Sequence, residues 1–563
     1  MKPAHEKYIP FVPLKMTRRA WPDRELKAPP VWCSVDLRDG NQALIDPMNV
    51  REKLELFHTL VDIGVKEIEV GFPSASETEY EFIRTLIEGG HIPDDVTIQV
   101  LVQAREHLIR RTFEAIDGAK HVIFHFYNST STLQRKVVFH TDVEGVKKIA
   151  VDAARLIREL SQPALDAGMD LRYEYSPESF MGTEMDAAVE ICQAVIEAIG
   201  ATPERKVILN LPTTVENCMP NYFADEIEYF ISRLPGRDRA IISLHPHNDR
   251  GEGVATAELG LLAWAERVEA TLFGNGERTG NVDMVTLALN LYTQGVDPKL
   301  DFSDINKIRD VYERVTKMKI GERQPYVGEL VFTAFSGSHQ DAINKGTRYM
   351  EESGTEYWEV PYLPIDPADV GRQYEPIIRI NSQSGKGGSA FVMQHSFGFD
   401  LPKAMHPEFG HIVQVETDRV GKELKPDAIY DLLKAHYIDA VKPYQLVQHS
   451  FAEFTDEEGH SHVTFAGTIR HTDTVFQVQG SGNGPIDAFF NAIHGQKMDR
   501  FTFIDYKEHA VKQGSDSQAV AYIHLQDENG RDWFGVGMSH NINLAPLKGI
   551  LSAINRAVSH DGK

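Results

Sequence analysis

The segment VWCSVDLRDGNQALIDPMNVREKLELFHTLVDIGVKEIEVGF, residues 31–72, contains the pattern that decides the fold. A short apolar run (31–37) is followed by a polar loop, a stretch with helical periodicity (49–64) and a second apolar run (66–72). This order predicts a strand, a helix and a second strand that runs parallel to the first.

The same unit recurs along the chain as far as about residue 275. Eight apolar or β-branched runs begin 24 to 49 residues apart, at 31–37, 66–72, 97–102, 121–127, 170–176, 206–212, 240–247 and 267–274. Eight strand–helix units in about 250 residues are typical of a TIM (β/α)8 barrel, an α/β fold. We predict this barrel for residues 31–328. The alternative is an open doubly wound sheet, which also alternates strands and helices.

The rest of the chain has a different rhythm. Residues 1–30 form an N-terminal extension, and residues 329–442 are rich in loops, which predicts a connecting subdomain. From residue 443 to 563 we expect an α+β domain. Its expected elements are three strands, a glycine-rich turn (GSGNGP, 480–485) that leads into a helix, a strand pair, and a final helix (544–558).

Composition limits the partners and the compartment. The 563 residues include 58 Lys+Arg and 82 Asp+Glu, a net charge of −24, which on average repels nucleic acid and anionic membrane surfaces. No apolar run approaches the ~18 residues that span a bilayer, and the N-terminus has no apolar signal region. Cys33, Cys192 and Cys218 lie far apart, which disfavours disulfides. We therefore expect a cytoplasmic protein.

Two histidines give the clearest sign of chemistry. His245 and His247 lie two positions apart at the end of the seventh predicted strand, so both side chains point to the same side. Asp39 and Asn281 follow the first and eighth predicted strands, which a closed barrel brings beside the seventh. Two imidazoles, a carboxylate and an amide suit a divalent ion such as Mg²⁺, Zn²⁺ or Mn²⁺. The alternative is a pair of interior histidines that are hydrogen-bonded to polar neighbours.

Two further motifs are open to more than one interpretation. In DLRDGNQ (36–42), Arg38 could reach an oxyanion, although the segment also suits a solvated turn. The run GSGNGP precedes a helix whose N-terminus could receive a carboxylate, but its glycines could equally serve only to shape the turn.

Several segments together resemble the 2-isopropylmalate synthases of the longer bacterial and fungal type, from about residue 8 to the C-terminus. They are DLRDGNQALIDPM (36–48), SPESF (176–180), LNLPTTVEN (209–217), LHPHNDRG (244–251), GNGERTGN (274–281), FSGSHQDAINKG (335–346), VPYLPIDP (360–367) and SQSGKGG (382–388). The first and fourth of these motifs alone would indicate only the wider superfamily of acyl-CoA Claisen synthases and related metal-dependent lyases.

The resemblance implies a condensation of acetyl-CoA with 2-oxoisovalerate, followed by thioester hydrolysis to 2-isopropylmalate and CoA. This is the first committed step of leucine biosynthesis, and it implies an acyltransferase that leucine inhibits. The resemblance further implies a homodimer and a divalent metal ion, and it allows K⁺ as an activator. A connecting subdomain of the same chain or of its partner would cover the barrel mouth.

The resemblance also assigns roles to residues. The metal ligands it implies are Asp39, His245, His247 and Asn281. The catalytic residues are Arg38, Glu178, His339 and Tyr362. The residues around the oxo acid are Arg38, Leu101, His125, Ser176, Asn210 and Thr214. The leucine-binding residues are Gly480, Gly482, Gly484 and Tyr506.

Three other functions compete with this one. A sister synthase that makes citramalate or homocitrate would differ only in the residues of the oxo-acid pocket. A lyase would catalyse the reverse carbon–carbon cleavage. A leucine sensor would keep the barrel only as a scaffold.

Overall fold

The computed structural model describes residues 4–334, 336–374, 388–420, 424–438, 440–455, 461–494, 498, 500–511 and 517–561. The chain forms two compact units. One unit comprises Met1–Phe332 and Pro364–Tyr374, and the other comprises Thr333–Leu363 and Glu375–Lys563. We describe each unit separately.

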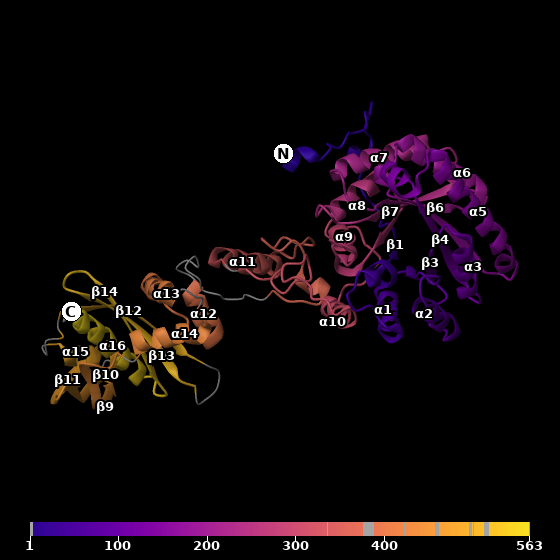
Figure 1. Ribbon diagram of the computed structural model, residues 1–563. Coiled ribbons are helices and arrows are strands. Elements are labelled where there is room, and N and C mark those ends of the chain that lie inside the picture. Colours follow the sequence, from indigo (N-terminus) through magenta and orange to yellow (C-terminus); the bar gives the residue numbers. More distant parts are fainter. Residues whose placement is uncertain are drawn as a thin grey trace. The chain divides into compact units, whose positions relative to one another are not determined.

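The first unit is a closed barrel of eight parallel strands in chain order, with β8 paired back to β1 (Figure 1). Its strands are β1 (Val31–Ser34), β2 (Glu67–Gly71), β3 (Thr97–Gln103), β4 (His121–Ser129), β5 (Asp170–Glu178), β6 (Val207–Thr213), β7 (Ala240–Pro246) and β8 (Arg267–Ala270). The predicted TIM barrel is therefore confirmed, and the open sheet is excluded.

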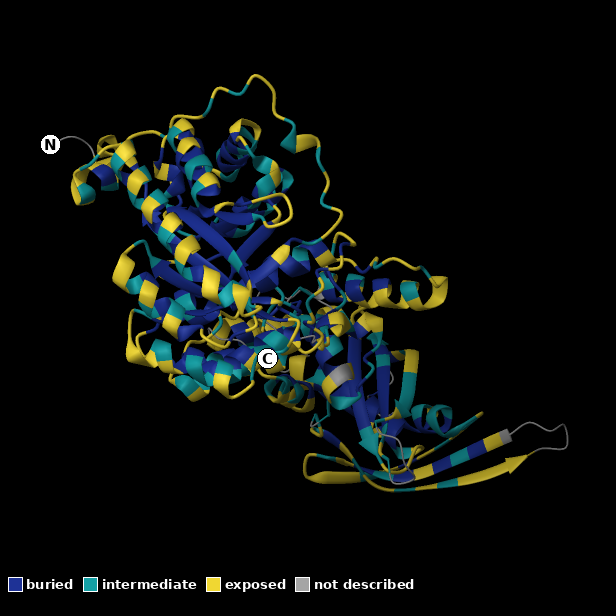
Figure 2. Cartoon of the chain, turned by 90° about the vertical axis from the view of Figure 1, so that its right-hand side faces the viewer, coloured by how far each residue is buried: buried dark blue, intermediate teal, exposed yellow. Residues whose placement is uncertain are grey.

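Helices surround the barrel and connect its strands. They are α1 (Val50–Ile63), α2 (Glu77–Glu88), α3 (Glu106–Ala115), α4 (Thr132–Gln134), α5 (Val143–Asp166), α6 (Met185–Ile199), α7 (Pro220–Arg233), α8 (Gly253–Leu262), α9 (Met284–Tyr292) and α10 (Ile305–Thr316). Helix α1 shows why these segments are helical. Asn49 and Glu52 form a capping box at its start, Gly64 ends it in the left-handed region, and Leu56 and Leu60 face the core. Figure 2 shows the resulting buried strands within a partly exposed layer of helices.

Two strands end earlier than the sequence predicts. The run 31–37 is a strand only as far as Ser34, because the chain then enters a π-helical turn, η3 (Asp36–Gly40), whose last three amide groups donate to the Val35 carbonyl. The eighth run, 267–274, ends as a strand at Ala270. Both early endings follow from Asp36, whose carboxylate accepts hydrogen bonds from the Ser34 hydroxyl and the Leu272 amide. These early turns give the polar residues that follow the two strands their positions.

The second unit contains helices α11 (Gly337–Ser353), α12 (Gly388–Phe397), α13 (His406–Val420) and α14 (Pro426–Leu433), followed by two antiparallel sheets. The first sheet holds β9 (Tyr444–Thr455), β10 (Ser461–His471) and β11 (Thr474–Gly482), and α15 (Pro485–Ile493) packs on it. The second sheet holds β12 (Phe501–Ala510), β13 (Ala519–Asp527) and β14 (Asp532–Ser539), and α16 (Leu544–Asp561) packs on it. This region therefore repeats one βββα arrangement twice.

Two expectations for this region are wrong. The expected strand pair is three strands, because β12 has a β-bulge between Phe503 and Asp505 that breaks the alternation of its charged sequence. The expected glycine-rich turn begins as strand, since β11 extends through Gly482. A Cβ on Gly480 would lie 2.7 Å from the Ala488 carbonyl oxygen, so the missing side chain allows α15 to approach the sheet.

Among the helices of the described residues, none is long and apolar enough to cross a membrane. The motif SQSGKGG (382–388) lies outside the described residues except for Gly388.

Candidate metal and substrate site

A cavity of about 220 Å³ opens at the C-terminal ends of the barrel strands, where TIM-barrel enzymes place their active sites. The cavity brings together ten of the predicted residues from six different strand ends. They are Arg38, Asp39, Leu101, His125, Ser176, Glu178, Asn210, Thr214, His245 and His247. The cavity is also lined by Gln42, Phe72, Tyr127, Pro212, Glu277 and Arg278.

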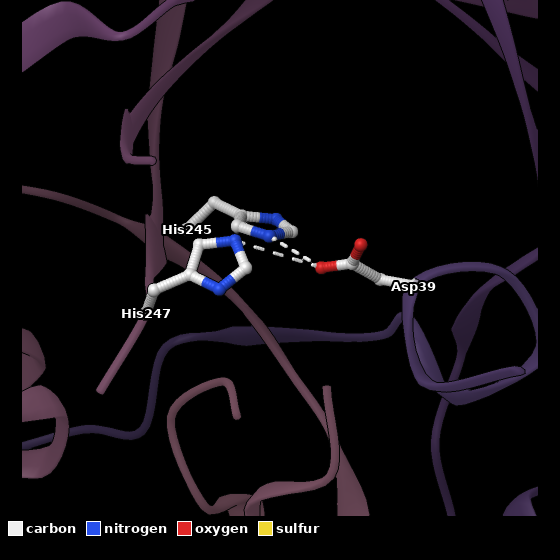
Figure 3. A group of neighbouring side chains, drawn as sticks. All are labelled: Asp39, His245 and His247. Atoms are coloured by element: carbon white, nitrogen blue, oxygen red, sulfur yellow. Dashed lines mark hydrogen bonds and ion pairs between the residues drawn. The ribbon is translucent and has the colours of Figure 1, made fainter. Parts of the chain in front are cut away.

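Three buried side chains converge on one point of this cavity (Figure 3). Asp39 Oδ2 lies 3.1 Å from His245 Nε2 and 3.8 Å from His247 Nε2. The strand β7 supplies the first histidine and its immediate continuation supplies the second, while the turn η3 supplies the aspartate. One ligand atom from each residue lies within 4.8 Å of the others, which is a spacing that one metal ion could span.

Asn281 provides an independent test of whether a metal ion fits. It forms an isolated bridge with His247, and its side-chain amide donates to Asp39 Oδ2 at 2.8 Å. Its Oδ1 atom is buried and accepts no hydrogen bond from the described residues. A buried carbonyl oxygen without a partner is costly, and a bound cation would satisfy it. The four residues therefore fit a divalent ion with oxygen and nitrogen ligands.

Charge is distributed unequally over the three ligand candidates. Burial opposes ionisation of Asp39, but Arg38 and His245 hold its pKa well below the usual range. Burial also opposes protonation of His245, but hydrogen bonds to Asp39 and Glu269 raise its pKa to about 9. Burial and the neighbouring His245 lower the pKa of His247 to about 4, so that imidazole is neutral at pH 7. Metal binding would therefore have to displace a proton from His245.

Arg38 is held by two carboxylates. Its Nη1 atom donates to Asp39 Oδ1 at 2.7 Å, and its Nε atom donates to Glu69. Burial lowers the pKa of Arg38, but the carboxylates of Asp39 and Glu69 raise it by more, so the guanidinium stays charged. A fixed cation that lines the cavity beside the ligand group can stabilise an oxyanion.

The remaining predicted pocket residues divide into polar and apolar. His125 Nε2 lies 2.7 Å from the Ser176 hydroxyl, to which the Asn210 amide also donates at 3.1 Å. Leu101 supplies an apolar surface. Burial raises the pKa of Glu178, against the opposing effect of Arg38, so this carboxyl can carry a proton at a higher pH than usual. Thr214 accepts a hydrogen bond from the Ser179 amide at 2.9 Å, which fixes the loop after β6.

Sequence reasoning missed a buried polar network below the cavity. Glu269 accepts from His245 Nδ1 at 2.6 Å, and the Gln99 amide donates to both Glu69 and Glu269 at 2.7 Å. Arg267 pairs with Glu269 at 3.1 Å. The signal was present in the sequence, since these residues interrupt the apolar runs at alternate positions, as in KEIEVGF and RVEA. Alternate positions of a barrel strand face the interior.

Glu69, His125 and Glu269 form a second group with metal-like spacing, but its centre is occupied. The Gln99 amide nitrogen lies 2.7 Å from each carboxylate and 3.2 Å from His125 Nδ1. A donor from the chain itself thus stands where a cation would bind. This group orients the residues of the cavity above it.

In the second unit the structure brings His339 and Tyr362 together. Their rings stack with centroids 4.0 Å apart, and Tyr362 is 61% exposed. Tyr362 also has a positive φ of 66°, which is uncommon for a residue with a large side chain. Glu178, the third predicted member of this group, belongs to the barrel unit.

The structure distributes the four predicted leucine-binding residues over two sheets. Gly480 and Gly482 lie on β11, and Gly484 is the N-cap of α15. Tyr506 lies on β12 in the other sheet, is 51% exposed and contacts Phe503. Close packing explains Gly480, whereas a Cβ on Gly484 would meet no atom within 4 Å.

The closed barrel and its Asp-His-His site define a class of enzymes, and the HMGL-like family model matches residues 29–312. Two further models match the rest: the alpha-isopropylmalate synthase post-catalytic domain-like model (329–394) and the LeuA allosteric (dimerisation) domain (423–558). The 2-isopropylmalate synthase of Clostridium acetobutylicum is 52% identical over 98% of this chain and 99% of its own, and that of Mesorhizobium japonicum is 52% identical over the full length of both. The chain belongs to the 2-isopropylmalate synthase family and is an acyltransferase.

The matches among solved structures are partial. A hydroxymethylglutaryl-CoA lyase from Pseudomonas aeruginosa is 18% identical and covers 53% of this chain and 97% of its own, with a TM-score of 0.42. The family assignment is carried by the full-length relatives.

Proposed function

We propose that this enzyme condenses acetyl-CoA with 2-oxoisovalerate and hydrolyses the thioester, releasing 2-isopropylmalate and CoA. The observation that carries the proposal is the convergence of Asp39, His245 and His247 beside Arg38 in one cavity. That cavity lies in a chain that is 52% identical to 2-isopropylmalate synthases over its full length.

Substrate choice would depend on the cavity residues other than the metal ligands. Leu101 offers apolar contact for the isopropyl group, while His125, Ser176 and Asn210 are linked by hydrogen bonds and limit the space. One methylene in such a pocket is worth only about 1–3 kcal/mol. Pyruvate and 2-oxobutyrate would therefore be poorer substrates that still react.

The residues of the barrel would stabilise charge on the oxo acid. Asp39, His245, His247 and Asn281 would hold a divalent ion, which when bound supplies Lewis-acid polarisation of the keto acid. Arg38 would donate to the alkoxide that forms at the ketone carbon, because it is charged and already fixed beside the ligand group.

A base must also remove a proton from the acetyl methyl group. His339, supported by the stacked Tyr362, is our candidate, with Glu178 as the carboxyl that could relay the proton. The resulting enolate carbon would attack the ketone carbon, and water would then cleave the thioester to give the carboxylate and the CoA thiol. This role requires that the region around α11 meet a barrel mouth, of the same chain or of a second copy.

Replacing His339 by Ala should lower kcat by about 10²–10⁴, the range for loss of a general base. The KM for 2-oxoisovalerate and the affinity for Mn²⁺ should change less than about threefold, because the oxo acid and the ion bind in the barrel. Steady-state kinetics and metal titration measure the two effects. Lys345→Ala on the same helix is the control, since Lys345 is exposed and pairs with Asp341 at the surface. An unchanged kcat in the His339 variant would remove it from the mechanism.

Thiol release from acetyl-CoA tests the proposed reaction. The full chain is assayed with 2-oxoisovalerate, 2-oxobutyrate, pyruvate and 2-oxoglutarate in parallel, with and without a chelator. The proposal predicts the fastest release with 2-oxoisovalerate and loss of release with the chelator. A preference for pyruvate or 2-oxoglutarate would indicate a citramalate or homocitrate synthase. Absence of release with all four acids would contradict a synthase and favour a lyase or a leucine sensor.

We also propose that leucine binds the C-terminal domain at the start of α15 and inhibits the enzyme. The support is the matched LeuA allosteric (dimerisation) domain, together with the open space at Gly484. The same domain supports a homodimer. K⁺ as an activator and a cytoplasmic location belong to the same proposal.

Gly484→Ala should raise the leucine concentration for half-inhibition by about tenfold without changing the uninhibited rate. Its φ of −166° is extended backbone that alanine adopts, so the added methyl group would occupy ligand space without straining the chain. Inhibition curves measure the effect. The control is Asn543→Ala, at the equivalent position before α16. Equal inhibition of Gly484→Ala and the unmodified chain would place the leucine site elsewhere.

A further inference from the structure

A lysine is completely buried beside the cavity, although it does not line it. Lys53 on α1 has a side chain that is 0% exposed, and its Nζ atom lies 5.1 Å from the centre of the Phe82 ring. Nζ donates a hydrogen bond at 3.2 Å to the carbonyl oxygen of Leu37 and forms an ion pair with Glu79 on α2. Leu37 lies inside the turn η3, immediately before Arg38 and Asp39.

Backbone hydrogen bonds hold the start of this turn. The amide groups of Arg38, Asp39 and Gly40 all point at the Val35 carbonyl, at 2.9 to 3.3 Å. On its other side the turn is held by the Asn275 amide, which donates to the Gly40 carbonyl at 3.0 Å. Lys53 contacts the middle of the turn, just before the two functional residues.

Glu79 extends the same contact to the next strand. Its Oε2 atom accepts a hydrogen bond from the Phe72 amide at 3.3 Å, and Phe72 lines the cavity. The carboxylate can reach this position only because residue 71 is glycine, since a Cβ there would collide with Oε2. One partly buried ion pair thus connects the turn after β1 with the end of β2.

Stability alone is a poor explanation for such a pair. Burial lowers the pKa of Lys53, against the opposing effect of Glu79, so holding the charge here has a cost. Replacing a buried ion pair with neutral residues of similar volume is often neutral or stabilising. A pair that contributes little stability but contacts both loops suits a role in positioning.

We propose that Lys53 and Glu79 are positioning residues that hold the Leu37 carbonyl and the Phe72 amide, and thereby fix Arg38 and Asp39 for metal and oxo-acid binding. The inference rests on the function proposed for that cavity. It adds the partly buried Lys53–Glu79 pair, which lies outside the cavity lining, to the residues that act at the cavity.

The test uses the full chain with Lys53→Met and Glu79→Gln combined, which removes both charges at similar volume. After metal removal, Mn²⁺ binding is titrated directly, and KM for 2-oxoisovalerate and the thermal midpoint are measured alongside. We expect a 10–100-fold loss of Mn²⁺ affinity, as for other residues that orient metal ligands, and a higher KM with little change in the thermal midpoint. Glu79→Gln alone should cause a smaller loss in the same direction, and it decides the question if the double variant does not fold.

The control is Arg135→Met with Glu184→Gln. Arg135 likewise pairs with a carboxylate and donates to a loop carbonyl, that of Thr130 at 3.0 Å, but that loop carries none of the four ligand candidates. This variant should keep its Mn²⁺ affinity. Unchanged Mn²⁺ affinity and KM in the Lys53 and Glu79 variants would overturn this inference and leave the proposed metal site standing. Failure of the unmodified chain to bind Mn²⁺ would overturn the proposed metal site and the inference with it.

Discussion

Asp39→Asn should lower kcat/KM for 2-oxoisovalerate by about 10³ and the affinity for Mn²⁺ by about 10², because the amide removes the one anionic ligand from the group. The side chain keeps its shape, so the barrel should fold normally. Steady-state kinetics and titration of the metal-stripped protein with Mn²⁺ measure the two losses.

Asp36→Asn is the matched control for this change. Asp36 lies in the same buried turn, but its carboxylate faces the Ser34 hydroxyl and the Leu272 amide and does not face the histidines. Burial raises its pKa to about 7, so part of its population is already neutral at that pH. The control should lower the thermal midpoint and leave the Mn²⁺ affinity nearly unchanged. An Asp39→Asn variant with kcat/KM within tenfold of the unmodified chain would contradict the assigned metal site.

Arg38→Met should lower kcat by about 10²–10³, the usual effect of losing one preorganised oxyanion donor. The effect of Arg38→Met on Mn²⁺ affinity should differ from the loss expected for Asp39→Asn. Removing a cation 2.7 Å from Asp39 should leave Mn²⁺ affinity unchanged or increase it. Measuring kcat and Mn²⁺ affinity on the same preparation separates the two roles.

Arg38→Lys provides the internal comparison. Lysine keeps the charge but cannot contact Asp39 and Glu69 at once in the planar geometry of a guanidinium. We expect activity between those of the Met variant and the unmodified chain. Equal activity of all three forms would exclude Arg38 from the reaction.

The barrel and its ligand group could be predicted because each depends on a local pattern. The alternation of apolar runs and amphipathic segments between residues 31 and 275 predicts strands and helices, and eight such units favour closure. The two-residue spacing of His245 and His247 places both on one side. Closure of the barrel then brings Asp39 and Asn281 to the two histidines. In the structure Asp39 Oδ2 lies 3.1 Å from His245 Nε2, and Asn281 forms an isolated bridge with His247.

In the polar network below the cavity, the alternation along each strand indicates interior positions, but the partners of these residues could not be predicted. A buried parallel strand usually reads as a continuous apolar run, and Glu69, Gln99 and Glu269 lie within such runs. These buried polar side chains are satisfied by partners such as Arg267, which pairs with Glu269 and donates to Gln99. No local pattern in the sequence reveals these pairings. The contact of Lys53 with the Leu37 carbonyl was hidden for the same reason, because a lysine in an amphipathic helix normally indicates a solvated face.

The C-terminal repeat was missed, although its two helices share the spacing of Pro, Ala and Ile in PIDAFFNAI (485–493) and PLKGILSAI (546–554). The strands β11 and β14 both use glycines to admit a helix, at Gly480 and Gly535, but the residues around them differ. The bulge in β12 also disguised one strand as a polar loop. Positions of glycines relative to a following helix would have been the better signal.

Direct competition between oxo acids tests the central claim most closely. The full chain is supplied with acetyl-CoA, Mn²⁺ and equal concentrations of 2-oxoisovalerate, 2-oxobutyrate, pyruvate and 2-oxoglutarate, and the products are identified by mass. The proposed function predicts 2-isopropylmalate as the main product, with smaller amounts from the two shorter acids. A different main product, or none at all, would contradict it.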